Sequence, residues 1–278
     1  MSSVTPVAPA TDSSSSVAPQ LRVTLVQTHL HWHDAAANHL QFARMIEPLH
    51  GTTDLIVLPE MFTTGFTMAA AEVAEPPGGP STEWMRRMAN RSGAVVTGSV
   101  VTRDGNGYFN RLIWMQPDGD YRTYDKRHLF RLGREHEHYS AGRDLLTVTL
   151  KGWSIRPLIC YDLRFPVWSR NRVGTEDGYD LLVYVANWPE RRRYPWTTLL
   201  RARAIENLSC CIGVNRVGTD ATGVTYTGDS AALDFLGEPM TQACEAEFLT
   251  TVSLDYAALK AFRGKFAAYL DADDFTLR

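Results

Sequence analysis

Three side chains of complementary reactivity each stand where a strand-like run of residues stops. Cys160, Glu60 and Lys126 are the last residues of the runs 155–160, 55–60 and 121–126. Open α/β sheets place their ligand sites at the carboxyl edge of their strands. We therefore expect one site for nucleophilic chemistry, in which a nearby ammonium favours the thiolate form of the cysteine.

The roles of these residues follow from what a cysteine nucleophile requires. It needs a base that takes its proton and donors that hold the oxyanion formed on the substrate. Glu60 can act as the base and then as the acid for the leaving group, while Lys126 supplies a fixed positive charge. The backbone N–H of Tyr161, directly after the thiol, can supply the second donor. Acyl transfer of this kind needs no metal and no organic cofactor.

The elements that must position these residues alternate between strands and helices. Strands are predicted at residues 21–28, 54–59, 94–102, 109–115, 121–124, 155–160, 180–186 and 210–214, and helices at 34–48, 82–91 and 194–207. A final hairpin is predicted between residues 229–235 and 248–254, and residues 260–270 close the chain as a helix or an extended arm. This alternation indicates an α/β protein with mixed sheets and helices outside.

Two local details are predicted from the same patterns. The inward stripe of the first helix is expected to consist of Leu40, Phe42, Met45 and Ile46. The second helix is expected to be capped at its N-terminus by Ser81 or Thr82.

Composition and charge narrow the class of protein. The chain has 278 residues, of which 44% are hydrophobic and 21% charged, as is ordinary for a soluble globular enzyme. A net charge of −3 gives no reason to expect nucleic acid or an anionic membrane as a partner, and no apolar run approaches the ~20 residues that span a bilayer. Four cysteines do not form a disulfide pattern, so a reducing cytoplasm is expected. Residues 1–19 read as a disordered tail and residues 20–278 as a single domain.

Three segments around the reactive residues resemble the Glu, Lys and Cys motifs of the nitrilase (carbon–nitrogen hydrolase) superfamily. These segments are residues 58–62, 124–130 and 159–166. Four further segments, residues 185–189, 201–207, 215–218 and 226–230, resemble the omega-amidase branch of that superfamily. The likeness runs from about residue 21 to the C-terminus.

The resemblance implies a four-layer αββα sandwich that pairs into homodimers through the helices beside the cysteine strand. It also implies a second glutamate in the loop between the lysine and the cysteine, where it orients the site. That loop contains Glu135 and Glu137. Counting back from Gly142 favours Glu135 as an anchor for the amide nitrogen or for Lys126, and Glu137 remains an alternative because loop lengths vary.

The resemblance further implies hydrolysis of the ω-amide of small 2-oxo dicarboxylic acids, such as 2-oxoglutaramate or 2-oxosuccinamate. Ammonia would be released through a thioester on Cys160. Within enzymes, the alternatives are hydrolysis of an aliphatic amide, an N-carbamoyl amino acid or a nitrile. Outside enzymes, the alternative is a binding or scaffold module on a nitrilase-like fold, and the intact Glu60, Lys126 and Cys160 argue against it.

Three other residues are candidates for substrate binding. Asn187 and Trp188 end a predicted strand beside the cysteine strand and are expected to line the pocket. Arg164 could bind a substrate carboxylate, as a nearby arginine does in related carbamoylase sites, or it could brace the cysteine loop through an internal ion pair.

Two groups of basic residues could suggest a metal site or a nucleic-acid site, and neither site is predicted. His136 and His138 would face the same way only on a strand, and no third ligand motif stands nearby, so no metal site is predicted. The run Arg191, Arg192 and Arg193 is interpreted as a solvated loop rather than a nucleic-acid patch, because the total charge is acidic.

Overall fold

The computed structural model describes residues 20–241 and 244–277. The first of its two large sheets has six strands in the order β13-β1-β2-β3-β4-β5. Their bounds are β1 (Gln20–Gln27), β2 (Leu55–Val57), β3 (Val95–Asp104), β4 (Gly107–Met115), β5 (Tyr121–Asp125) and β13 (Phe248–Asp255). The strands β1, β2 and β3 are parallel, and β3, β4 and β5 form an antiparallel meander. Consequently β2 and β5 point the same way, and the residues that follow them meet at one edge.

The second large sheet has five strands in the order β12-β9-β8-β7-β6. Their bounds are β6 (Val148–Leu150), β7 (Trp153–Ile159), β8 (Leu181–Val185), β9 (Cys210–Val214) and β12 (Ala231–Leu233). The central strands β7, β8 and β9 are parallel, and β6 and β12 pair antiparallel at the edges. Every residue of β8 and β9 is buried, as expected for parallel strands that are covered on both faces. A short ribbon joins β10 (Val217–Thr219) to β11 (Thr225–Thr227).

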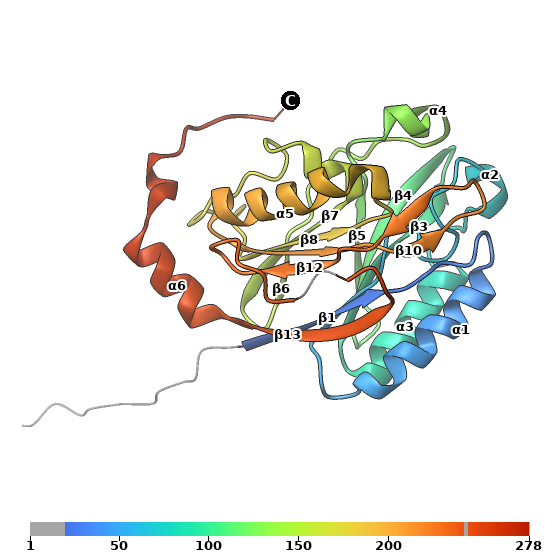
Figure 1. Ribbon diagram of the computed structural model, residues 1–278, viewed down its shortest axis with the longest axis horizontal. Coiled ribbons are helices and arrows are strands. Elements are labelled where there is room, and N and C mark those ends of the chain that lie inside the picture. The colour runs from blue at the N-terminus through green and yellow to red at the C-terminus, as the bar shows by residue number, and fades with distance from the viewer. Residues whose placement is uncertain (1–19, 242–243, 278) are drawn as a thin grey trace, which may run out of the picture.

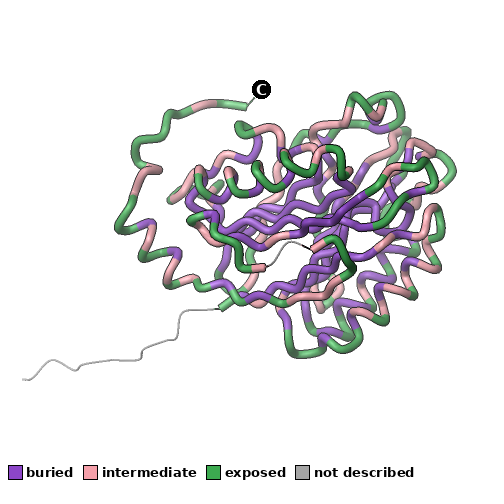
Figure 2. The backbone as a smooth tube through the Cα atoms, in the orientation of Figure 1, coloured by how far each residue is buried: buried purple, intermediate pink, exposed green. Residues whose placement is uncertain are grey.

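The two sheets pack face to face, and helices cover their outer faces (Figure 1). Helices α1 (Ala35–Ile46) and α3 (Pro80–Ser92) cover the first sheet, and α5 (Arg193–Asn207) covers the second. Figure 2 shows the buried chain concentrated in the sheets between these helices. The predicted four-layer αββα sandwich is therefore confirmed.

Local sequence features account for the way each helix packs. Asp34 caps α1 by accepting a hydrogen bond from Ala37 N at 2.9 Å. On the other side of the molecule, Gly213 of β9 allows α5 to approach closely, because a Cβ atom there would lie 2.6 Å from Leu200 and 2.8 Å from Trp196. The other α-helices of the described residues are α2 (Ala70–Val73), α4 (Glu135–His138) and α6 (Tyr256–Lys265).

Three predictions about elements are corrected by the structure. The final hairpin is wrong, because β12 pairs with β9 in one sheet while β13 pairs with β1 in the other. Leu40 is 55% exposed on α1, whereas Phe42 and Ile46 are buried. The N-cap of α3 is Gly79 followed by Pro80 at the first helical position, a common placement for proline.

The C-terminal segment adopts the helical alternative, as α6 followed by a 3₁₀ turn at Ala268–Asp271. The tail predicted at residues 1–19 lies outside the described residues. Among the residues that are described, no helix has the length and apolar character needed to cross a bilayer.

Candidate active site

The three reactive residues come from both sheets and converge where the sheets face each other. Glu60 lies three residues beyond β2, and Lys126 directly follows β5 in the same sheet. Cys160 directly follows β7 of the other sheet and begins the 3₁₀ turn η3 (Cys160–Arg164). The site therefore forms between two sheets, rather than along the edge of a single sheet.

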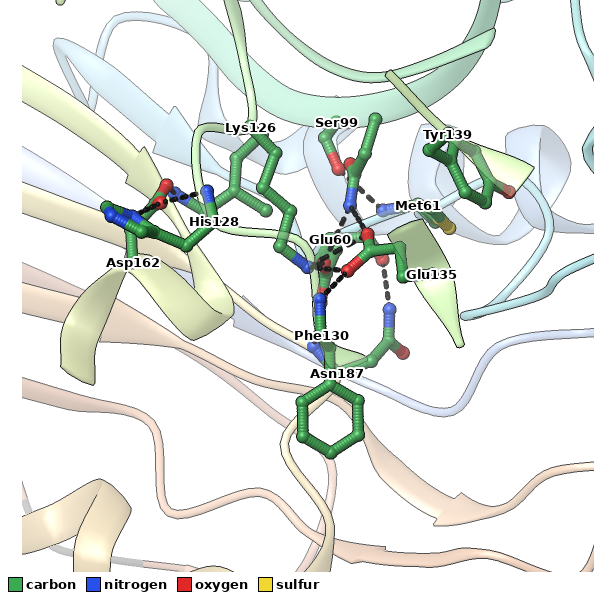
Figure 3. Close-up of polar contacts among 12 residues, drawn as sticks. Glu60, Met61, Ser99, Lys126, His128, Phe130, Glu135, Tyr139, Asp162 and Asn187 are labelled. Atoms are coloured by element: carbon green, nitrogen blue, oxygen red, sulfur yellow. Dashed lines mark hydrogen bonds and ion pairs between the residues drawn. The ribbon is translucent and has the colours of Figure 1, made fainter. Parts of the chain in front are cut away.

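A buried ion triad forms the centre of the site (Figure 3). The Lys126 Nζ lies 2.8 Å from Glu60 Oε1 and 3.0 Å from both carboxylate oxygens of Glu135. The lysine side chain is 1% exposed, and both carboxylates are fully buried. Burial alone would lower the pKa of Lys126, but the charges of Glu135 and Glu60 outweigh it and raise the pKa. The ammonium is thus permanently charged and already engaged by two carboxylates.

Of the two candidate glutamates, Glu135 lies in the site and Glu137 does not. Besides its contacts with Lys126, Glu135 accepts a hydrogen bond from Phe130 N at 2.6 Å. Burial raises the pKa of Glu135 while the Lys126 charge opposes that rise, and donors to both oxygens favour the ionised form. Glu137 is exposed on α4 and pairs with Arg134.

Asn187, two residues beyond the strand β8 of the second sheet, fixes the position of Glu60. The backbone N–H of Asn187 donates to Glu60 Oε2 at 2.8 Å, and the Asn187 Nδ2 donates to the Glu60 carbonyl at 2.5 Å. On the other side, Met61 adopts a positive φ of 42° and its N–H donates to Ser99 Oγ at 2.8 Å. Groups that follow or belong to strands of both sheets therefore contact Glu60 and its neighbour Met61. The packing of the two sheets thus sets the orientation of the Glu60 carboxylate toward the centre of the site.

Two buried residues that the sequence analysis did not single out organise the site. Asn110 of β4 donates from Nδ2 to Glu60 Oε1 at 2.7 Å and to Glu135 Oε1 at 3.3 Å. Asp162 accepts from Ile159 N at 3.1 Å and also receives the hydrogen bonds of Tyr124 and His128. An asparagine within a predicted strand of mainly apolar and aromatic residues was the available signal for Asn110. Asp162 lies within the cysteine motif itself.

Cys160 combines backbone strain with access to a cavity. Its φ of 42° is a left-handed conformation that few residues other than glycine adopt, and such strain clusters at functional sites. Its side chain is 9% exposed and lines a cavity of about 440 Å³. The turn thus presents the sulfur to the cavity floor.

The thiol is not activated in the way that the sequence suggested. Burial raises the pKa of Cys160 well above its ordinary value, the Glu60 charge and hydrogen bond raise it further, and Lys126 only partly opposes the rise. Because Lys126 is neutralised by two carboxylates, a thiolate here would add another negative charge to a buried site. The resting form is therefore the neutral thiol beside Glu60.

Alkylation of Cys160 by iodoacetamide is consequently expected to be slow at neutral pH and to accelerate steadily as the pH rises, because only the thiolate reacts. The modification rate of the Cys160 peptide can be followed by mass spectrometry, with the half-buried Cys244 as an internal reference. A rate that is already at its plateau at neutral pH would contradict the raised pKa.

The cavity above the sulfur includes all the residues predicted to bind substrate. Asn187, Trp188, Arg164 and Tyr161 all line it. The Arg164 guanidinium lies 5.1 Å from the centre of the Trp188 ring. Within the described part of the chain, Arg164 has no ion-pair partner, so the internal ion pair considered above is not formed.

Other walls of the cavity come from residues that had not been predicted to line it. These residues include Trp32, Phe66, Phe130, Arg191, Arg192 and Tyr226. They belong to five separate segments of the chain, and only the folded arrangement brings them together. The cavity is apolar and aromatic on its sides and carries guanidinium groups.

The two histidines His136 and His138 lie on the one-turn helix α4, which begins at Glu135. They therefore do not lie on a strand. In the described residues, no group of three or more His, Cys, Asp or Glu side chains is placed to hold a metal ion.

Comparisons with known proteins extend over nearly all of the described chain. The family profile described as Carbon-nitrogen hydrolase matches residues 22–263. Omega-amidase YafV of Yersinia enterocolitica is 48% identical over 261 residues, which cover 92% of this chain and 98% of the relative. The 2-oxoglutaramate amidase of Bacillus subtilis is 34% identical over 205 residues, covering 73% of this chain and 78% of the relative.

Among solved structures, XC1258 from Xanthomonas campestris superposes with a TM-score of 0.91 at 50% identity. The match covers 94% of this chain and 100% of that protein, which is described as a CN-hydrolase superfamily protein with an arsenic adduct in its active site. The sequence comparisons and the structural comparison therefore indicate the same family, the carbon–nitrogen hydrolases.

Proposed function

This chain belongs to the carbon–nitrogen hydrolase family, and on that premise we propose that it hydrolyses the ω-amide of small 2-oxo dicarboxylic acids, releasing ammonia. The observation that carries the proposal is the buried Glu60–Lys126–Glu135 triad beside a cysteine that lines a cavity of about 440 Å³. The similarity to an omega-amidase and to a 2-oxoglutaramate amidase supports this substrate class.

The first step is attack of the Cys160 sulfur on the amide carbon. Because the resting thiol is neutral, its proton passes to Glu60 as the S–C bond forms. The Lys126 ammonium and the Tyr161 backbone N–H hold the oxyanion of the tetrahedral intermediate, and losing one such donor typically costs about 3–4 kcal/mol of transition-state stabilisation. The pair of carboxylates on Lys126 fixes the ammonium in place before the substrate arrives.

The second and third steps reuse Glu60. Its proton passes to the amide nitrogen, the C–N bond breaks, and ammonia leaves a thioester on Cys160. A water molecule then gives a proton to Glu60 as its oxygen attacks the thioester carbon. The C–S bond breaks, the departing sulfur takes that proton back from Glu60, and the carboxylic acid product is released. Glu135 acts through Lys126, which it contacts with both oxygens.

The substrate-binding roles are assigned from the free polar groups of the cavity. Asn187 Oδ1 is buried without a hydrogen-bond partner in the described residues, and it can accept from the substrate amide N–H. Trp188 forms an apolar wall. Arg164, free of any acidic partner in the same part of the chain, offers positive charge to the substrate carboxylate.

A substrate panel tests this function. Ammonia release is expected to be fastest from 2-oxoglutaramate or 2-oxosuccinamate. It should be at least about tenfold slower from an uncharged aliphatic amide or nitrile, because charge-assisted recognition is worth at least that factor. An N-carbamoyl amino acid also carries a carboxylate, so it tests the fit of the reacting end of the substrate rather than the recognition of charge. A faster rate with one of the other three classes would replace the proposed substrate. A complete absence of turnover and of a trapped thioester by mass spectrometry would favour a binding module.

Further proposals concern assembly and location. Residues 20–278 are proposed to form a single domain, supported by a hydrophobic core shared between both sheets. A homodimer is proposed, supported by the apolar side chains of Ile205 and Phe266, which are 48% and 55% exposed and line one surface hollow. Sedimentation analysis would test the dimer.

A cytoplasmic location is proposed from the free cysteines.

A further inference from the structure

We propose that Arg192 is a second residue that binds the far carboxylate of the substrate and that it sets the preference for amides with an anionic end. The proposal deepens the function above and rests on it. Arg192 lies in the connection between β8 and α5, within the 3₁₀ turn η4 (Glu190–Arg192). It lines the same cavity as Cys160 and Lys126.

The position of Arg192 is fixed by contacts that leave its guanidinium donors free. Its backbone carbonyl accepts a hydrogen bond from Trp188 Nε1 at 2.7 Å. Its guanidinium lies 4.8 Å from the centre of the Phe130 ring, whose own backbone N–H is bonded to Glu135. Among the described residues, no carboxylate or other acceptor bonds to this guanidinium. The side chain is thus oriented by an aromatic face, with all five donors available to a ligand.

The charge balance of the cavity favours an anion at this end. Arg164, Arg191 and Arg192 line the cavity, and the described chain gives none of them an ion-pair partner. The acidic residue in the lining, Asp220, accepts hydrogen bonds from Thr222, Val224 and Tyr226, and its single negative charge leaves the three guanidiniums in excess. Lys126, in contrast, is compensated by two carboxylates. A bound carboxylate would therefore relieve repulsion among the guanidiniums.

The surroundings distinguish Arg192 from its neighbours in the sequence. Arg192 is half-buried, whereas Arg191 is exposed and its charge is screened by solvent. Arg193 forms ion pairs with Asp229 and Glu245, so its charge is already compensated. Burial, followed by the nearby charges of Arg191 and Arg164, lowers the pKa of Arg192, while the Cys160 side chain acts in the opposite sense. The guanidinium and the sulfur line the same cavity, so a substrate bound there can contact both.

The proposal is tested by comparing two substrates in Arg192→Met. For 2-oxoglutaramate, kcat/KM is expected to fall about 10–100-fold, mainly through KM, because a bidentate charge-assisted contact is lost. For an uncharged aliphatic amide of matched length, kcat/KM is expected to change less than about threefold, because that substrate never makes the contact. Arg192→Lys should fall between, since it keeps the charge and loses the planar fork.

Arg191→Met is the matched control for a simple change of cavity charge, and its effect on the carboxylate substrate should be much smaller than that of Arg192→Met. An equal loss with both substrates in Arg192→Met would assign it a structural role. No loss with either would leave the carboxylate to another residue, such as Arg164. Either result would overturn the proposal.

A binding measurement separates this proposal from the proposed function. In the full chain carrying Cys160→Ala, calorimetric binding of 2-oxoglutarate should weaken at least about tenfold when Arg192→Met is added. Retained affinity would overturn the role of Arg192 even if the enzyme hydrolyses ω-amides. Conversely, an Arg192-dependent affinity in a protein whose wild type releases no ammonia would overturn the function alone.

Discussion

Replacing Cys160 by alanine is expected to reduce ammonia release from 2-oxoglutaramate by at least about 10⁴-fold, because no other group in the cavity can form the thioester. The cavity and the ion triad remain in this variant, so it should still bind 2-oxoglutarate. Its thermal stability should stay close to that of the wild type, because the replacement removes a single sulfur atom at the wall of a cavity. Turnover is measured by an ammonia assay, and binding by calorimetry.

Cys244→Ala is the matched control for this experiment, because Cys244 is a half-buried thiol outside the cavity lining. It should retain wild-type turnover. If the Cys160→Ala protein released ammonia at the wild-type rate, covalent catalysis by this residue would be ruled out. Loss of binding together with turnover would instead indicate a damaged fold.

Replacing Lys126 by methionine is expected to affect both stability and activity. It leaves two carboxylates, Glu60 and Glu135, buried without a cation, and removing one partner of a buried ion pair typically costs about 3–5 kcal/mol of unfolding free energy. Turnover should fall by about 10³-fold or more through loss of the oxyanion contact. Denaturant unfolding and the ammonia assay measure the two effects.

The stability loss in Lys126→Met should depend on pH. Burial already raises the pKa of Glu135, and removing the ammonium that opposes this rise raises it further. A carboxyl with a raised pKa in the folded state favours folding at low pH, and that contribution is lost as the pH increases through the folded-state pKa. The variant should therefore be closest to wild-type stability in acid and weakest at neutral pH.

Lys126→Met combined with Glu135→Gln provides a control for the cause of this loss. The double variant should recover part of the unfolding free energy, because one unpaired charge is removed from the interior. Activity should stay low, since the oxyanion donor is still missing. Additive losses in the double variant would show that packing, rather than charge, underlies the effect.

The positions of the reactive residues could be predicted because their signals are local. Cys160, Glu60 and Lys126 each follow a strand that the periodicity of the chain predicts, and the structure places all three at one centre. Predicting that Glu135 belongs to the site required the family resemblance as well. Glu135 and Glu137 are only two residues apart in one loop, and this difference decides whether the carboxylate is buried or exposed. The structure places Glu135 in the interior and Glu137 in solvent.

Pairings between distant segments could not be predicted in the same way. In the sequence, residues 231–233 and 248–255 resemble the two strands of a hairpin. In the structure they join different sheets, because residues 231–233 pair with the free edge of β9 and residues 248–255 pair with the free edge of β1. The outward position of Leu40 likewise depends on where α3 and the first sheet meet α1. Hydrophobic periodicity identifies a strand or a helix, but it carries no information about the partner that covers it.

Whereas the four-layer arrangement was what the family resemblance implied, the sequence by itself determined which reactive groups this protein has and the strands that end at them. These are properties of short segments, whose patterns are set by the alternation of polar and apolar side chains. Only the tertiary structure decided the raised pKa of Cys160, the placement of Arg192 in the cavity without an ion-pair partner among the described residues, and the support of Glu60 by Asn187 and Asn110. Each of these depends on the sum of burial and charge over residues far apart in the chain, a quantity that exists only once both sheets have packed together.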